Sequence, residues 1–271
     1  LERGGAQGAL DKVLSGETVA TFAWTERAQR YSLAARATKA DRAGGGFEIT
    51  GEKTMVLGAP LADLFIVTAD LDGETRAFLV ASDAAGLDMR PYRLTDGSMA
   101  GEVKLTRVAL GEGALLDLDA GALAAIASEV RLQAAAEMVG LSQRLLDDTL
   151  AYVKEREQFG VPIGSFQVLQ HRLVEAYAKI EQSRSMLYRA AMRARDADAG
   201  GQAGDWQRAI AGAKAYIGEN ADAIAREAVQ MHGGMGITDE LAIGHAMKRV
   251  MVLARLFGDT DSVLAEYALA A

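Results

Sequence analysis

"KEREQFGVPIGSFQVLQHRLVEA" occupies residues 154–176 and joins two segments that have the apolar spacing of long helices. Arg156 ends the first helix, where the helix dipole favours a cation, and Gly160 and Pro162 then break the chain. These general reasons do not explain why two phenylalanines and two glutamines gather on both sides of the break. Arginine recognises planar phosphate or carboxylate groups, and phenylalanine stacks on flat rings. A plain helix–helix turn and a ligand site are therefore alternatives for this corner (residues 156–167).

The segments on either side of the corner predict a helical bundle. Apolar residues recur across 132–153 with the period of an amphipathic helix. Further helices are expected at 167–198, 206–231 and about 240–256, and 196–205 is interpreted as a solvated loop. Four long helices with short connections are typical of a bundle.

The residues before 112 have a different character, with alternating or β-branched runs separated by turns rich in Asp and Gly. The predicted strand runs are 17–26, 31–40, 46–58, 63–82 with a turn at 70–75, and 101–110. We therefore expect a multi-domain α+β chain. Residues 1–16 are the tail of a helix, 17–112 form an antiparallel β domain, and 113–271 form the helical bundle.

The composition excludes several classes of site and partner. The net charge of −8 and the pI of about 5.1 disfavour nucleic acid and anionic membranes as partners. The chain has no cysteine and only three histidines, and His171 and His245 lack a second ligand one helical turn away. We therefore expect no disulfide and no metal site. Neither a membrane-spanning apolar run nor a signal-peptide pattern is found, which predicts a soluble, cytoplasmic protein.

A second candidate site is the glycine-rich turn "QMHGGMGIT" at residues 230–238. Glycines allow backbone N–H groups to approach an anion or a cofactor closely. The alternative is an ordinary helix–helix turn, which is the usual explanation of such a motif on its own. It is not the dinucleotide-binding fingerprint, because no strand precedes it.

Taken together, the two motifs resemble the C-terminal helical domain of the acyl-CoA dehydrogenase family. "TFAWTE" (21–26) is similar to the Leu-Thr-Glu strand of that family, and 46–69 is similar to its Gly-x-Lys hairpin and the strand that follows. The resemblance covers nearly the whole chain. It implies a middle β-barrel domain and a C-terminal four-helix bundle, with the N-terminal helical domain of the family absent from this sequence.

The resemblance also implies a reaction, a cofactor and partners. Family members oxidise an acyl-CoA thioester to its 2,3-enoyl form, with a carboxylate removing the α-proton and FAD accepting the hydride. It implies an oligomer and an electron-transfer protein that accepts electrons from FAD. The residues that match FAD contacts in the family are Thr25, Arg156, Gln158, Phe159, Phe166, Gln167, Gln230, Gly233, Gly234 and Thr260. Within that set, the corner residues match those that reach the FAD of a neighbouring subunit.

Two stretches that face the flavin in the family have different residues here. Gln29, Arg30 and Tyr31 stand in place of a small Gly-Ser-Asp stretch. Met55-Val56-Leu57 replaces Trp-Ile-Thr, and a leucine cannot donate the hydroxyl hydrogen bond of threonine.

The position of the catalytic base also differs. Gly258 stands where most family members have glutamate, and Asp259 follows it. A minority of members use a glutamate on the first bundle helix, but that position is Val130, next to Glu129. The favoured interpretation is a subunit without its own base in a heteromeric, steroid-type acyl-CoA dehydrogenase. The alternatives are an active homo-oligomer that uses Asp259 or Glu129, and a scaffold homologue without flavin.

Overall fold

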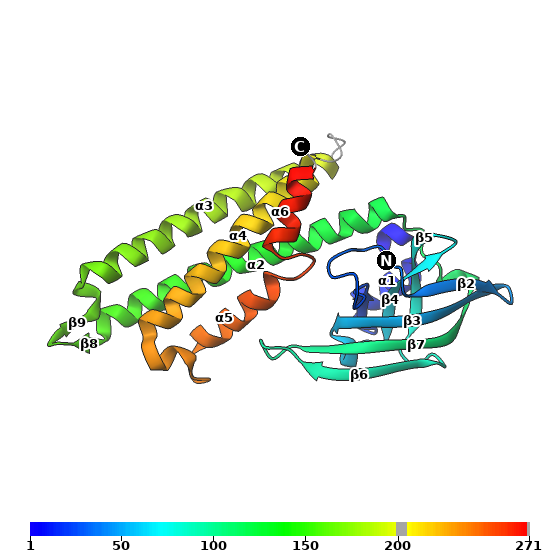
Figure 1. The fold of residues 1–271 in the computed structure, drawn as a ribbon, viewed down its shortest axis with the longest axis horizontal. Helices are drawn as coiled ribbons and strands as arrows, with labels where there is room; N and C mark the ends of the chain where they lie inside the picture. The colour runs from blue at the N-terminus through cyan, green and yellow to red at the C-terminus, as the bar shows by residue number, and fades with distance from the viewer. Residues whose placement is uncertain (199–204, 270–271) are drawn as a thin grey trace. The chain divides into compact units, whose positions relative to one another are not determined.

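The structure is a computed structural model that describes residues 1–198 and 205–269. It divides into two compact units, Leu1–Ile126 and Ala127–Ala271 (Figure 1). The domain limits given by the sequence, after residues 16 and 112, stay predictions. Most of the expected loop 196–205 lies outside the described residues, between the end of α3 at Asp198 and the start of α4 at Asp205.

The first unit begins with the short helix α1 (Gln7–Leu14), which confirms the helix predicted there. A seven-stranded sheet follows, in the order β1-β4-β2-β3-β7-β6, with β5 paired to β4. The strands are β1 (Ala20–Ala23), β2 (Lys39–Ala43), β3 (Gly46–Leu57), β4 (Leu64–Leu71), β5 (Glu74–Ala81), β6 (Leu87–Arg93) and β7 (Met99–Gly111).

The antiparallel prediction is correct for the hairpin pairs but not for two contacts of β4. Residues 20–23 of β1 and 39–40 of β2 both pair in parallel with β4, against 64–67 and 70–71 respectively. The two strands therefore form two parts of one interrupted strand along a single edge of β4. The barrel predicted from the sequence resemblance stays a prediction.

The interruption overturns the strand predicted at 31–40, because only Lys39 and Ala40 of that range are in a strand. The backbone N–H groups of Arg36, Ala37 and Thr38 donate to the Glu26 carboxylate at 3.0, 2.8 and 3.0 Å. Donors used in this way cannot join a ladder of strand hydrogen bonds.

The strand β6 (Leu87–Arg93) was not predicted from the sequence.

A buried ion pair holds this interruption in place. The Lys53 ammonium of β3 lies 2.9 Å from Glu26 and also donates to the Thr68 hydroxyl of β4 at 3.0 Å; the side chains of Lys53 and Glu26 are 0% and 2% exposed. Burial raises the pKa of Glu26, but the hydrogen bonds from Ala37, Lys53 and Arg36 outweigh it and lower the pKa to about 2. The ionised carboxylate therefore contributes stability above its ordinary pKa of 4.5, and this contribution is lost as the pH falls through about 2.

The second unit is helical. It contains α2 (Ala120–Glu155) from residue 127 onward, and all of α3 (Gln167–Asp198), α4 (Asp205–His232), α5 (Ala242–Leu253) and α6 (Thr260–Leu269). Side chains of α2, α3, α4 and α5 share two buried apolar clusters. None of the helices in the described residues is both long and apolar enough to cross a membrane.

The predicted helices are confirmed with two differences. The helix predicted at 132–153 begins earlier, at Ala120, where the Asp119 carboxylate accepts the Ala122 N–H at 2.7 Å and the alanine-rich first turns favour a helix. The helix expected to end near 256 ends at Leu253, and α6 was not predicted. The limits of α3 agree with the sequence prediction.

We expect Lys53→Met to lower the free energy of unfolding of the first unit by about 3–5 kcal/mol, because it leaves the Glu26 charge buried without its partner. Urea unfolding followed by Trp24 fluorescence, in a Trp206→Phe background, measures this unit. The control is Arg27→Met, which removes exposed ion pairs to Glu52 and Glu102 and should change the stability little, because water screens exposed charges. Equal losses in the two variants would contradict the role given to the buried pair.

Candidate functional site

The corner between α2 and α3 is a tight hairpin with an exposed aromatic tip. Residues Glu157–Gln158 (β8) pair with Val161–Pro162 (β9), and the two residues between them, Phe159 and Gly160, have φ of 55° and 81°. Two consecutive positive φ values define the two-residue turn that best matches the twist of a hairpin. Phe159 is 93% exposed, and its ring centroid lies 6.2 Å from that of Phe166, edge to face.

The polar side chains of the corner face solvent. Arg156, Gln158 and Gln167 are all exposed. The Arg156 backbone is fixed, because its N–H donates to Tyr152 and its carbonyl accepts from Ile163, both at 2.8 Å. Its guanidinium has no hydrogen bond or ion pair with any residue that the structure describes. An anchored arginine with five unused donors can bind an external phosphate or carboxylate.

An apolar groove of about 470 Å³ lies beside the hairpin. It is lined by Leu150, Val153, Lys154, Pro162, Gly164, Gln170, Leu173 and Val174. The groove was not foreseen from the sequence, because it depends on how the end of α2, the corner and the start of α3 pack against one another.

The glycine-rich turn begins where α4 ends and forms the short 3₁₀ helix η5 (Gly233–Ile237). Gly236 is required for packing, since a Cβ there would lie 2.7 Å from the Val229 carbonyl oxygen. Gly233 has a φ of 60°, but a Cβ at Gly233 or Gly234 would meet nothing within 4 Å. Packing therefore does not explain Gly234, and the backbone at Gly233–Gly234 is open to a ligand. Gln230 is exposed on the last turn of α4.

An aromatic stack brings the corner and the glycine turn to the same end of the second unit (Figure 1). The Tyr152 ring of α2 and the His232 ring of α4 stack with centroids 4.3 Å apart, and the His232 Nδ1 is 2.8 Å from the Ala228 carbonyl oxygen. Tyr152 precedes Arg156 by one helical turn, and His232 directly precedes Gly233. Two motifs far apart in sequence are therefore neighbours, although neither aromatic residue was singled out from the sequence.

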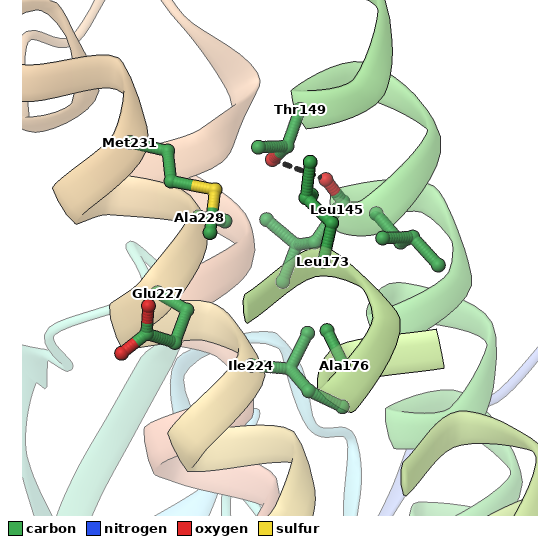
Figure 2. A pocket seen from close by; sticks show the side chains of 9 residues that line it. Leu145, Thr149, Leu173, Ala176, Ile224, Glu227, Ala228 and Met231 are labelled. Atoms are coloured by element: carbon green, nitrogen blue, oxygen red, sulfur yellow. Dashed lines mark hydrogen bonds between the residues drawn. The ribbon is translucent and has the colours of Figure 1, made fainter. Parts of the chain in front are cut away.

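The interior between these helices contains a small cavity (Figure 2) of about 10 Å³, with room for about one water molecule. Its walls are mostly apolar, and its polar side chains already have partners. Thr149 donates to the Leu145 carbonyl at 2.6 Å, and Glu227 forms an ion pair with Arg172. This cavity is a packing feature, and the candidate ligand site lies on the surface outside it.

Thr25 lies in the first unit, whereas every other predicted cofactor residue lies in the second. Thr25 is half-buried two residues after the end of β1, and its carbonyl accepts the Thr54 N–H at 2.9 Å. Nearby, Met55 has a φ of 53° at a register shift of β3 and is 41% exposed. Leu57 has no polar side chain, and its backbone carbonyl accepts a hydrogen bond from the Thr21 hydroxyl at 2.5 Å.

The base position has no room for a side chain. Gly258 has a φ of 130°, and a Cβ on it would lie 2.6 Å from Val263 Cγ1. Asp259 caps α6, because its carboxylate accepts the Ser262 N–H at 3.0 Å, and Thr260 is the first residue of α6. On α2, Glu129 and Val130 are both half-buried.

Two buried cations surround this turn, which we define as residues 254–260. The Arg131 Nε of α2 donates to the Phe257 carbonyl at 2.7 Å, and its guanidinium pairs with Glu266 of α6. Lys214 of α4 is 2% exposed and donates to the carbonyls of Ala254 and Gly258 at 2.9 and 3.3 Å. Burial, and then the Arg131 charge, lower the pKa of Lys214 to about 7, against the attraction of Asp259. The sequence does not show that this lysine is buried.

Two family descriptions match the chain. That of the acyl-CoA dehydrogenase C-terminal domain covers residues 122–268, and that of the acyl-CoA dehydrogenase middle domain covers residues 21–108. The chain therefore belongs to the acyl-CoA dehydrogenase family, whose members are oxidoreductases acting on CH–CH groups.

Individual relatives have related but different activities. A 3-(aryl)acrylate reductase of Clostridium sporogenes is 29% identical over 93% of this chain and 68% of its own length. The mitochondrial isovaleryl-CoA dehydrogenase of Arabidopsis thaliana is 30% identical over 88% of this chain and 60% of its own length. Among solved structures, a variant of the Tcur3481-Tcur3483 steroid ACAD has a TM-score of 0.87 and 28% identity, over 99% of this chain and 72% of that chain. The chain thus corresponds to part of the length of these relatives.

The described residues contain no group of three or more acidic or histidine side chains that could hold a metal ion.

We expect Gly258→Ala to lower the free energy of unfolding of the second unit by about 1–3 kcal/mol, because alanine cannot adopt the glycine conformation without strain. Trp206 fluorescence during urea unfolding, in a Trp24→Phe background, measures this loss. Gly140→Ala is the matched control: Gly140 is an exposed residue within α2, and a Cβ there meets nothing within 4 Å. The control should gain about 0.5–1 kcal/mol. A neutral or stabilising Gly258→Ala would show that the turn tolerates a side chain.

Proposed function

We propose that the chain is an FAD-binding acyl-CoA dehydrogenase subunit that takes part in α,β-dehydrogenation of an acyl-CoA thioester. The observation that carries the proposal is the convergence of the unpaired Arg156 guanidinium, the exposed Phe159 ring and the open Gly233–Gly234 backbone at one end of the bundle. Two phosphates and a flat ring system are the chemistry that these groups suit.

Each group has a role in this proposal. Arg156 and the N–H groups of Gly233 and Gly234 would bind phosphate, and Phe159 and Phe166 would contact a ring. Gln158, Gln167 and Gln230 would supply hydrogen bonds, and Thr25 and Thr260 would contact the flavin. FAD, when bound, supplies the hydride acceptor. Leu57 lacks the hydroxyl of its family counterpart, so the first unit would contribute less to flavin binding.

We further propose that the chain works in an oligomer. The exposed corner residues match those that reach the FAD of a neighbouring subunit in the family, so the cofactor that Arg156 binds would belong to an adjacent subunit. A dimer or a dimer of dimers formed through the helical bundle is the expected assembly. An electron-transfer protein is the proposed electron acceptor, and the cytoplasm is the proposed location. The acyl chain is not specified by any residue described above.

The base would come from a paralogous partner subunit. Gly258 offers no side chain, and the Asp259 carboxylate is occupied in capping α6. The similar steroid ACAD is designated by two components, Tcur3481 and Tcur3483, and this supports a paired enzyme of the same kind. The alternatives are a homo-oligomer in which Asp259 or Glu129 acts as the base, and a scaffold that binds no flavin.

The absorbance spectrum of the purified protein distinguishes the three hypotheses of a paired subunit, a homo-oligomer and a scaffold. It is recorded for the protein alone and together with candidate partner subunits. Flavin bands that appear only with a partner support the paired subunit. Bands and turnover in the protein alone support the homo-oligomer. Absence of flavin in every combination supports the scaffold and would refute the proposed function.

Arg156→Ala should weaken FAD binding about tenfold or more while leaving the fold intact, because a lost hydrogen bond to a charged group costs about 1.5–3 kcal/mol. Flavin titration followed by fluorescence quenching measures the affinity, and circular dichroism checks the fold. The control is Arg144→Ala, which removes an exposed α2 arginine paired with Asp148. Unchanged affinity in Arg156→Ala would favour a simple helix-end role.

Asp259→Asn should change the activity of the assembled pair little, because asparagine also caps a helix and the partner supplies the base. If Asp259 were the base, the amide could not accept the α-proton and turnover would fall by several orders of magnitude. Steady-state oxidation of acyl-CoA by the assembled enzyme distinguishes these outcomes. A preparation of this protein alone that oxidises acyl-CoA, and loses that activity in Asp259→Asn, would refute the paired-subunit proposal.

A further inference from the structure

Lys214 is a buried cation for which the proposed function gives no role. It lies in the first half of α4 and belongs to neither motif, and no carboxylate in the described residues accepts a hydrogen bond from it. Burying an ammonium without a hydrogen-bonded counterion is unfavourable. Such a group persists where its donors satisfy backbone carbonyls that would otherwise be buried and unpaired.

The carbonyls in question belong to the 254–260 turn. Lys214 takes those of Ala254 and Gly258, and Arg131 takes that of Phe257. Phe257 and Gly258 have φ of 54° and 130°, so two consecutive residues lie outside the conformations that most residues prefer. Glycine adopts a positive φ without strain, so the strained residue is Phe257, and its conformation persists only where surrounding groups hold it.

The backbone conformation at Gly258 determines where its carbonyl points. The carbonyl of Gly258 is directed at Lys214, and the next residue, Asp259, starts α6 as its cap. Rotating the Gly258 backbone to a negative φ would move this carbonyl away from the Lys214 ammonium. The conformation of Gly258 and the position of Lys214 are therefore coupled.

We propose that Lys214 is a positioning residue: by holding the Gly258 carbonyl, it sets the backbone of the 254–260 turn in a conformation that requires glycine at position 258. This inference rests on the proposed function only in giving that turn a place at the flavin site. The contact itself belongs to the protein without cofactor or substrate.

The charged groups around Lys214 are Arg131 on α2, Asp259 in the turn, and Glu266 on α6, which neutralises Arg131. Since the pKa of Lys214 is lowered to about 7, part of the population carries a neutral amine at neutral pH. A neutral amine keeps two N–H donors, which is enough for Ala254 and Gly258. The positioning contact therefore survives deprotonation.

The first test is a thermal double-mutant cycle with Lys214→Met and Gly258→Ala. Methionine fills similar space but donates no hydrogen bond. If Lys214 imposes the positive φ of Gly258, the turn is free to adopt a conformation that alanine tolerates in Lys214→Met. The melting-temperature loss from Gly258→Ala should then be about half or less of its value in the wild type. Additive losses would show that Lys214 only fills space and would overturn the proposal.

The second test is hydrogen exchange measured by mass spectrometry on the protein without ligands. A peptide covering 254–263 should exchange about tenfold faster in Lys214→Met, while α2 is unchanged. Lys248→Met is the control, since it removes a lysine of the same unit that pairs with Asp239 near the surface. It should leave the peptide protected.

Gly258→Ala keeps the proposal testable if Lys214→Met does not fold, because it breaks the same contact from the other side. It should open the same peptide by a similar factor. Protection equal to the wild type in Gly258→Ala would overturn the proposal. Failure of flavin binding would bear on the proposed function alone, because neither test involves flavin.

Discussion

The first unit depends on a carboxylate buried with its ammonium partner. Transferring both charges out of water costs several kcal/mol per ion, so the site persists only because each remaining oxygen and proton is hydrogen-bonded. Glu26 obtains its bonds from the 36–38 backbone, and Lys53 obtains its bonds from Trp24, Glu26 and Thr68. The pair thereby fixes a loop between two short strands and the position of Thr25 directly before it. In the second unit, the buried cations Arg131 and Lys214 are likewise hydrogen-bonded, in their case to backbone carbonyls of the 254–260 turn.

The parts of the fold that the sequence revealed are those decided by neighbours along the chain. The break at the corner and the polar, glycine-rich stretch after 196 predicted the limits of α3, and Asp-Gly signals located the β4–β5 turn. The strand predicted at 31–40 was wrong. The alternation there is compatible with a strand, but the backbone N–H groups of Arg36 and Ala37 donate to the Glu26 carboxylate instead of to another strand. The helix α6 was missed because its start depends on Asp259 as a cap, whereas that residue was considered chiefly as a base.

In the candidate site, too, local motifs were found from the sequence and contacts that depend on packing were not. Arg156, Phe159 and the glycine turn are visible in the sequence because local motifs carry them. The stack of Tyr152 on His232, which joins them, depends on how α2 and α4 pack. Nothing in the pattern around Lys214 distinguishes a buried lysine from an exposed one, since its environment is supplied by α2 and by the turn after α5. Sequence therefore suggests which residues meet a ligand, and packing determines what holds them there.

The turn at Gly258 also bears on how such a chain changes over generations. Glycine and glutamate codons can differ by a single base, so in genetic terms a carboxylate at this position is one step away. In structural terms it is several steps away, because the φ of Gly258, the Val263 methyl and the Lys214 contact would all have to change with it. A single change to glutamate would therefore add the carboxylate before the surrounding packing could accept its side chain.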